Sequence, residues 1–190
     1  MRVSLKTKII GLLLGLALAP ILKAADKFVT FNKEEGTLAL TTTQQPNFSI
    51  LCADEEHKGV LMAVRNLQED FFRVTNTRPY LKIGAKKQVD KGAQKLRILI
   101  GSFDKSPLIK QLVKAKKLDV RELKGKNEKF IITTVTNPIE GVEGEVLLIA
   151  GSDKRGTIYG IYELSCQIGI SPWYWWADVP VMKQANVYIK

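Results

Sequence analysis

The sequence predicts an α/β fold in which a single mixed β-sheet is packed with about three helices. Short apolar runs of the strand type alternate along the chain with longer segments whose apolar residues recur every three or four positions. Two of the expected strands follow each other without a helix between them, which favours a mixed rather than a purely parallel sheet. With 190 residues, 45% of them hydrophobic, the chain can bury one core but not two large ones.

The first elements follow from apolar patterning and turn residues. Residues 28–40 are expected to form a hairpin-like stretch, and a buried strand is expected over 47–53. Residues 55–75 predict an amphipathic helix, because their apolar positions are spaced by four, three, four and three. These positions are Val60, Val64, Leu67, Phe71 and Val74.

The middle of the chain repeats this alternation. Residues 80–83 and 96–100 predict two further strands. Ser106 and Pro107 then begin a second helix, which ends near residue 117, because serine caps helix starts and proline suits the first helical position.

The last third predicts two strands and a long helix. The strands cover residues 129–136 and 145–150, and the helix covers about 154–168. Asp153 is the expected cap at its start, and Gly169 ends it. The inward stripe of this helix is Thr157, Ile161, Leu164 and Ile168. Gly156 and Gly160 share a helix face, which indicates that another part of the protein packs closely against it.

The N-terminus has the pattern of a secretory signal peptide over residues 1–25. Three basic residues lie within the first eight positions, an apolar run covers 9–22, and small residues offer a cleavage site near Ala24 or Ala25. The run is shorter than the roughly 20 residues that a membrane span requires. We therefore expect a cleaved leader rather than an anchor, and a secreted or periplasmic protein.

The charge distribution and the cysteine and histidine content indicate which partners, disulfides and metal sites to expect. Four basic residues belong to the leader, so the formal charge falls from +10 to +6 for the remaining chain. The lysines alternate with acids and apolar residues, which favours a solvated face, and we expect no nucleic-acid partner.

Export allows a disulfide between Cys52 and Cys166, but two buried free thiols are favoured. With His57 as the one histidine, expected to face solvent, no Cys/His metal site and no cofactor are expected.

The segment 151–157 lies where phosphate-binding loops lie, after a strand and at the start of a helix. Lys154 precedes the second glycine instead of following it, so neither a P-loop nor a dinucleotide motif is formed, and no nucleotide is expected. The helix start, with Asp153, Lys154 and Arg155, suits the carboxylate of an acidic sugar or of a neighbouring domain. Helix capping and ordinary ion pairs are the favoured alternative.

All the tryptophans lie together: Trp173, Trp175 and Trp176 flank Tyr174 in a loop between Pro172 and Pro180. The rings can stack on sugars or be buried against another domain, and docking is slightly favoured. Asp178 is the carboxylate within this cluster, and a cap or turn role is expected for it. No pair of carboxylates is singled out by its surroundings, so no catalytic residue is assigned.

Residues 151–181, GSDKRGTIYGIYELSCQIGISPWYWWADVPV, closely resemble the end of the N-terminal domain of glycoside hydrolase family 115, the xylan α-glucuronidases. A weaker resemblance extends back to about Phe48. Similar N-terminal domains precede the catalytic barrels of families 67 and 20. After the signal peptide over 1–25, the resemblance implies an accessory α/β domain over 26–182 and the start of a linker to a catalytic barrel over 183–190.

The resemblance further implies a non-catalytic domain, a fragment of a secreted glycoside hydrolase that removes glucuronic acid side chains from xylan with inversion. The barrel that carries catalysis is expected to be missing from this chain, so its own enzymatic activity is left open. The implied partners are that barrel and an acidic plant polysaccharide, glucuronoxylan. Two alternatives remain: a stand-alone carbohydrate-binding module with a tryptophan platform, and an inactive truncated product.

Overall fold

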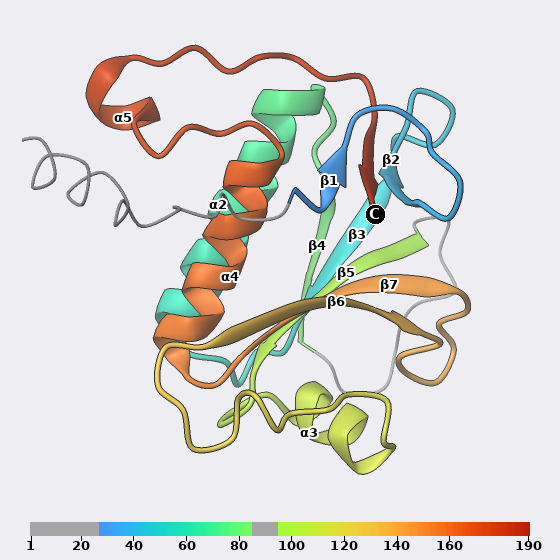
Figure 1. Cartoon of the computed structure of the whole chain (residues 1–190), viewed down its shortest axis with the longest axis vertical. Coiled ribbons are helices and arrows are strands. Elements are labelled where there is room, and N and C mark those ends of the chain that lie inside the picture. Colours follow the sequence, from blue (N-terminus) through green and yellow to red (C-terminus); the bar gives the residue numbers. More distant parts are fainter. Residues whose placement is uncertain (1–26, 85–94) are drawn as a thin grey trace, which may run out of the picture.

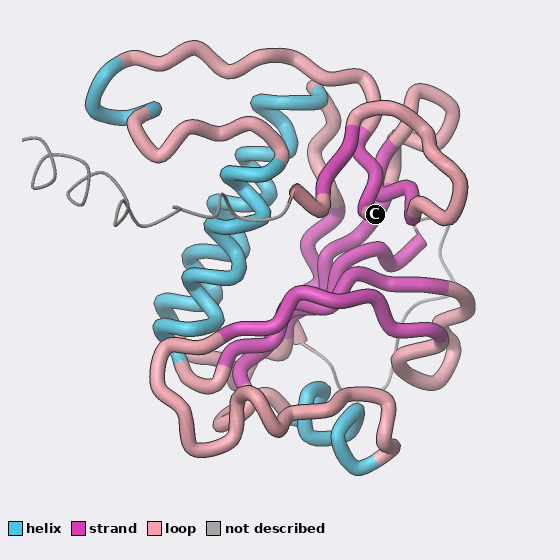
Figure 2. The backbone as a smooth tube through the Cα atoms, viewed as in Figure 1, coloured by secondary structure: helices cyan, strands magenta, loops and turns pink. Residues whose placement is uncertain are grey.

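The computed structural model describes residues 27–84 and 95–190, apart from the side chain of Trp175. The predicted leader over 1–25 lies outside the described residues. The described part has the predicted α/β fold, with helices on both faces of a mixed sheet (Figure 1). A second, three-stranded sheet is present in addition to the single sheet expected (Figure 2).

The main sheet has five strands in the order β4-β3-β5-β7-β6. The first four run parallel, and β6 pairs antiparallel with β7. The central strands read as nearly continuous apolar runs because both of their faces are covered. Their bounds match the predicted strands closely: β3 Phe48–Cys52, β4 Tyr80–Ile83, β5 Lys95–Ser102, β6 Phe130–Thr136 and β7 Glu145–Gly151.

Three helices longer than one turn cover this sheet within the described residues. Helices α2 (Lys58–Thr75) and α4 (Lys154–Gln167) lie side by side on one face, and α3 (Pro107–Lys114) packs against the other (Figure 1). Both predicted inward stripes of α2 and α4 are fully buried, as amphipathic spacing requires. A further short helix, α5 (Tyr174–Ala177), forms where the sequence indicated a loop.

Two glycines let α4 approach the sheet, as the sequence indicated. A Cβ added at Gly156 would lie 2.2 Å from the carbonyl oxygen of Lys129, just before β6. One added at Gly160 would lie 2.8 Å from a methyl carbon of Ile149 on β7. The close partner of both glycines is therefore the sheet of the same domain.

The second sheet corrects two expectations. Strands β1 (Val29–Thr30) and β2 (Leu38–Thr41) do not form a hairpin, because β8 (Val187–Ile189) lies between them and pairs antiparallel with both. The segment 183–190, expected to begin a linker, thus contributes a buried strand to this domain. The hairpin was expected because turn residues lie between the two strands. Such turn residues carry no information about a third strand from the other end of the chain.

The two cysteines differ from each other in burial. Both are free, but Cys166 is exposed on α4 and only Cys52 is buried, so the expectation of two buried thiols is wrong for Cys166. Burial raises the pKa of Cys52 to about 12.

Among the described helices, none combines the length and the apolar character that crossing a membrane requires.

Candidate functional site

The main sheet has a topological switch point between β3 and β5, where the order in which the chain adds strands to the sheet reverses. From β3 the chain passes through α2 to β4 on one side, and β5 then pairs with β3 on its other side. Helix α2 covers one face and α3 the other, so the loops after β3 and β5 diverge. In open α/β sheets such a switch point, at the carboxyl ends of parallel strands, is where ligands usually bind.

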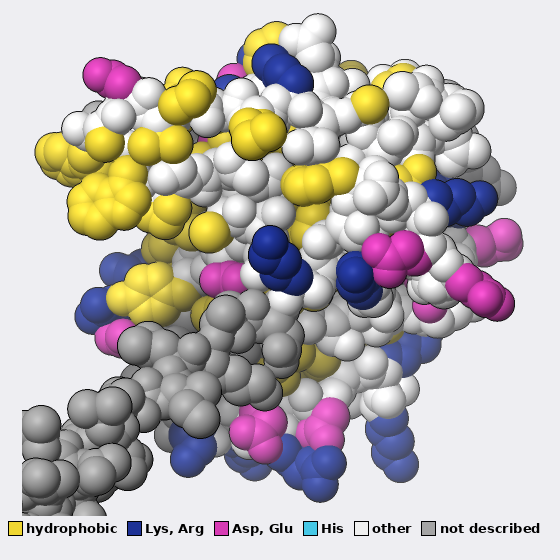
Figure 3. All heavy atoms as spheres, turned by 45° about the horizontal axis from the view of Figure 1, so that its top comes forward, with side chains coloured by type: hydrophobic (Ala, Val, Ile, Leu, Met, Phe, Trp, Pro, Cys, Tyr) yellow, Lys and Arg dark blue, Asp and Glu magenta, His cyan; other side chains and the backbone are white. Residues whose placement is uncertain are grey.

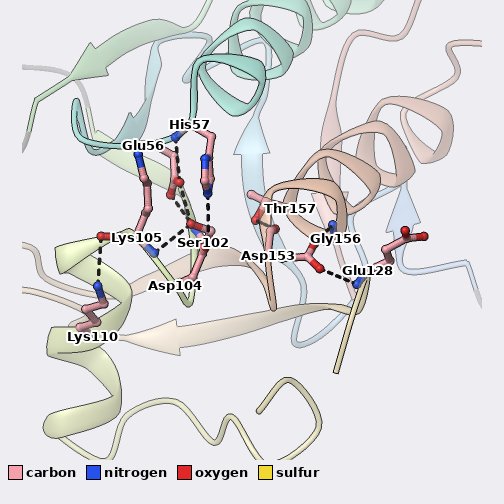
Figure 4. Close-up of polar contacts among 10 residues, drawn as sticks. All are labelled: Glu56, His57, Ser102, Asp104, Lys105, Lys110, Glu128, Asp153, Gly156 and Thr157. Carbon is pink, nitrogen blue, oxygen red and sulfur yellow. Dashed lines mark hydrogen bonds and ion pairs between the residues drawn. The ribbon is translucent and has the colours of Figure 1, made fainter. Parts of the chain in front are cut away.

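A buried carboxylate joins these two loops. Glu56, in the loop after β3, is only 4% exposed. Its Oε2 accepts a hydrogen bond from the backbone N–H of Ser102 at 2.6 Å, and its Oε1 accepts one from the Ser102 hydroxyl at 2.6 Å (Figure 4). Oε1 also accepts the backbone N–H of His57 at 3.1 Å. The end of β5 and the start of α2 are therefore held together by one side chain.

His57 does not face solvent freely, which corrects the sequence-based expectation. Its Nε2 lies 3.0 Å from Oδ2 of Asp104, and its side chain is 25% exposed. Burial raises the pKa of Asp104, but hydrogen bonds from Ser102 and His57 more than offset this and hold the pKa below its usual value. The structure therefore brings Glu56, His57, Ser102 and Asp104 into one polar cluster (Figure 4).

Asp153 caps α4, as predicted. Its Oδ1 accepts the N–H of Gly156 at 2.8 Å, and its Oδ2 accepts the N–H of Glu128 at 2.9 Å. The Gly156 N–H is the main cause that lowers the pKa of Asp153. Arg155 pairs with Glu128 at 2.8 Å and donates to the hydroxyl of Tyr159 at 2.8 Å. Capping and pairing therefore account for Asp153 and Arg155, while Lys154 is exposed beside the start of α2.

The tryptophan segment, residues 171–184, follows the C-terminal end of α4. The side chains of Trp173 and Trp176 are 65% and 83% exposed. The backbone of Trp175 forms part of α5, and the structure does not describe its side chain. Asp178 ends α5 in the left-handed conformation at φ 47°, which is a turn role, and lines a shallow hollow with Tyr174, Val179 and Pro180.

The predicted site residues thus form two separate groups. Helix α4 has 14 residues, so its ends are about 21 Å apart. Asp153 and Lys154 lie near the cluster around Glu56 at one end, and the tryptophans lie at the other. Sequence reasoning missed Glu56, Ser102 and Asp104, although their position after two predicted parallel strands was a usable signal.

Comparison with known proteins places this fold among glycoside hydrolases. No protein-family model and no curated protein matches the sequence. The structure resembles that of a family GH115 4-O-methyl-α-glucuronidase, BtGH115A, with specificity for decorated arabinogalactans. The match has a TM-score of 0.57 and 29% sequence identity, and covers 78% of this chain. A weaker likeness to the structure of CpGH84D has a TM-score of 0.46 and 8% identity over 85% of this chain and 22% of that one.

The resemblance to family 115 is therefore confirmed, and the chain is a glycoside-hydrolase-related domain. The matched region amounts to 16% of the length of BtGH115A.

Proposed function

We propose that this chain is a non-catalytic accessory domain of an exported α-glucuronidase-like glycoside hydrolase, and that its exposed aromatic surface docks against a catalytic barrel. The similarity to BtGH115A supports the class of enzyme. The observation that carries the docking role is the exposure of Trp173 and Trp176, because indoles left in water are unusual outside binding surfaces.

The proposed docking surface consists of Met62, Tyr162, Trp173, Trp176 and Met182. Their exposed fractions are 64%, 44%, 65%, 83% and 73%. Figure 3 shows hydrophobic side chains gathered at the part of the surface that includes α5. Asn66, one turn after Met62, donates a hydrogen bond of 2.8 Å to the hydroxyl of Tyr162. As proposed, the surface combines the outer side of the α2/α4 pair with the tryptophan segment.

The composition of this surface favours a protein partner over a sugar. A sugar platform uses flat rings, whereas two of the five side chains are methionines. Methionine and aromatic residues are enriched together where proteins associate, since the flexible thioether adapts to an irregular partner. A catalytic barrel of the same class of enzyme is the partner that the similarity to BtGH115A suggests.

The polar cluster at the switch point does not supply the catalytic pair of an inverting glycosidase. Such carboxylates lie about 6.5–9.5 Å apart, to leave room for a water molecule. The ligand oxygens of Glu56 and Asp104 lie within 4.8 Å of each other. Glu56 is also buried and fixed by three hydrogen bonds, so it cannot reach a sugar.

The test mixes the purified chain with BtGH115A from which the region that matches this chain has been removed, so that the part expected to hold the barrel remains, and follows binding by sedimentation velocity. We expect a complex of micromolar affinity that Trp176→Ser weakens at least tenfold. Tyr80→Ser is the control, since Tyr80 is 58% exposed on the edge strand β4, outside the docking surface. The chain alone should release no glucuronic or 4-O-methylglucuronic acid from glucuronoxylan or arabinogalactan. Release of either acid, or no complex with the barrel, would contradict the proposal.

A carbohydrate-binding role is the second candidate, favoured by one observation. Trp173 and Trp176 are three positions apart around a helical turn, a spacing that places side chains on one face. Affinity electrophoresis in gels that contain glucuronoxylan distinguishes the two roles. Retardation that Trp176→Ser abolishes would favour the sugar platform, and unchanged mobility would favour docking.

A further inference from the structure

We propose that Glu56, His57 and Asp104 bind one divalent cation of the zinc type at the switch point between β3 and β5. One nitrogen of His57 and one carboxylate oxygen from each acid all lie within 4.8 Å of one another. Imidazole nitrogen with carboxylate oxygen is a zinc ligand set, whereas calcium takes six to eight oxygens. This site is independent of the docking role.

The three proposed ligands differ in how deeply they are buried. Glu56 is 4% exposed at the bottom, while the side chains of His57 and Asp104 are 25% and 44% exposed above it. A cation can therefore enter from solvent, and the outer side remains open for a water molecule as fourth ligand. Three protein ligands and a water are the usual shell of an open zinc site.

The carboxyl group of Glu56 forms no ion pair with a basic side chain within residues 27–84 and 95–190. The ion pairs found there involve other acids. Buried charges are normally paired with an opposite charge or coordinate a metal, because taking a carboxylate out of water is costly. The three hydrogen bonds to Glu56 occupy three of about four acceptor positions of a carboxylate, which leaves one for a cation.

The scaffold around the ligands is already fixed. His57 precedes the first turn of α2, and Asp104 lies between Ser102, held by Glu56, and Ser106, which caps α3. The 3.0 Å between His57 Nε2 and Asp104 Oδ2 is close to the about 3.3 Å edge of a tetrahedron with zinc bonds of about 2.0–2.1 Å. Small side-chain movements would therefore complete the coordination.

The test uses the tag-free full chain, stripped with EDTA and titrated with Zn²⁺ in a competition assay against a chromogenic chelator. We expect saturable binding of one ion per chain. Zn²⁺ at about 100 times its dissociation constant should raise the melting temperature by about 5 °C or more. His57→Gln and Asp104→Asn should each weaken binding at least tenfold, and both replace a partly exposed side chain by a polar one of similar size, so the fold should survive.

Two controls separate this site from other zinc ligands. Glu128→Gln removes a carboxylate at the neighbouring helix start, and Cys166→Ser removes the exposed thiol. Neither should change the affinity. The proposal is overturned if zinc does not bind saturably, if His57→Gln leaves binding unchanged, or if calcium binds more tightly than zinc.

Discussion

The guanidinium carbon of Arg73 lies 5.4 Å from the centre of the Tyr174 ring. Arg73 belongs to the last turn of α2 and Tyr174 to α5, so this contact ties the tryptophan segment to the helix pair. Arg73 also donates to Asp70, which is 6% exposed, at 2.9 Å. A backbone hydrogen bond of 2.9 Å from Gln184 to Val74 holds the other end of the segment. The tryptophan segment is therefore tied to α2 at two places, through Tyr174 and through Gln184.

Arg73→Leu should loosen this segment and destabilise the protein. The change removes the cation over Tyr174 and the guanidinium that pairs with the largely buried Asp70 carboxylate, which should cost about 1–3 kcal/mol. Limited trypsin digestion should cleave after Lys183 several-fold faster than in the original chain. Arg65→Leu, an exposed position of the same helix, is the control. Equal cleavage rates in both variants would show that the Arg73 contact does not fix the segment.

Gly156→Ala should destabilise the protein, although alanine favours helices by about 1 kcal/mol. The new Cβ would lie 2.2 Å from the backbone carbonyl of Lys129, which cannot move without shifting the start of β6. We expect a net loss of about 1–3 kcal/mol in urea unfolding.

Gly59→Ala is the matched control, because this glycine also lies in the first turn of a helix. Its nearest neighbour would be the terminal methyl of Ile158 at 3.3 Å, which can turn away. We expect Gly59→Ala to be neutral or slightly stabilising. A similar loss in both variants would mean that close packing is not the cause.

Asp153→Ala should lower the free energy of unfolding by about 1–2 kcal/mol, because two backbone N–H groups lose their acceptor. Asp153→Asn keeps a side-chain oxygen and should lose less. Urea unfolding at pH 7 measures both.

The effect of Asp153 should also depend on pH. Its pKa is lowered in the folded state from 3.8, so the folded protein binds this proton less readily than the unfolded chain. The stabilisation is therefore complete well above pH 3.8 and is lost as pH falls through the folded-state pKa. The stability difference between the original chain and Asp153→Asn should shrink in acid, and a constant difference would contradict this assignment.

The two thiols should react at very different rates. Cys166 is exposed, whereas Cys52 is buried with a pKa of about 12. Because the thiolate is the nucleophile, a disulfide reagent at pH 8 should modify one thiol per native chain and the second only after unfolding. Cys166→Ser should abolish the fast reaction. Two fast thiols in the native chain would be inconsistent with the burial of Cys52.

The main sheet and its helices could be predicted from sequence because local patterns define them. The spacing of Val60, Val64 and Leu67 specifies both the helix and its buried face, and Asp153 and Gly169 mark the limits of α4. Each of these signals lies within a few residues of the structure that it predicts.

The small sheet and the polar cluster could not be predicted in the same way. Val29 pairs with Ile189, 160 positions later, and no local pattern encodes that choice. Likewise, the contact of His57 with Asp104 depends on how β3 and β5 pair, because each residue alone resembles an ordinary surface group.

The position of β8 between β1 and β2 has a consequence for biogenesis. Because β1 and β2 do not pair with each other, the small sheet cannot assemble during synthesis until residues 187–189 have emerged from the ribosome. If the leader directs export, a nascent chain would reach the translocation channel with this sheet still open. Late closure would therefore keep the polypeptide competent for threading through a narrow pore.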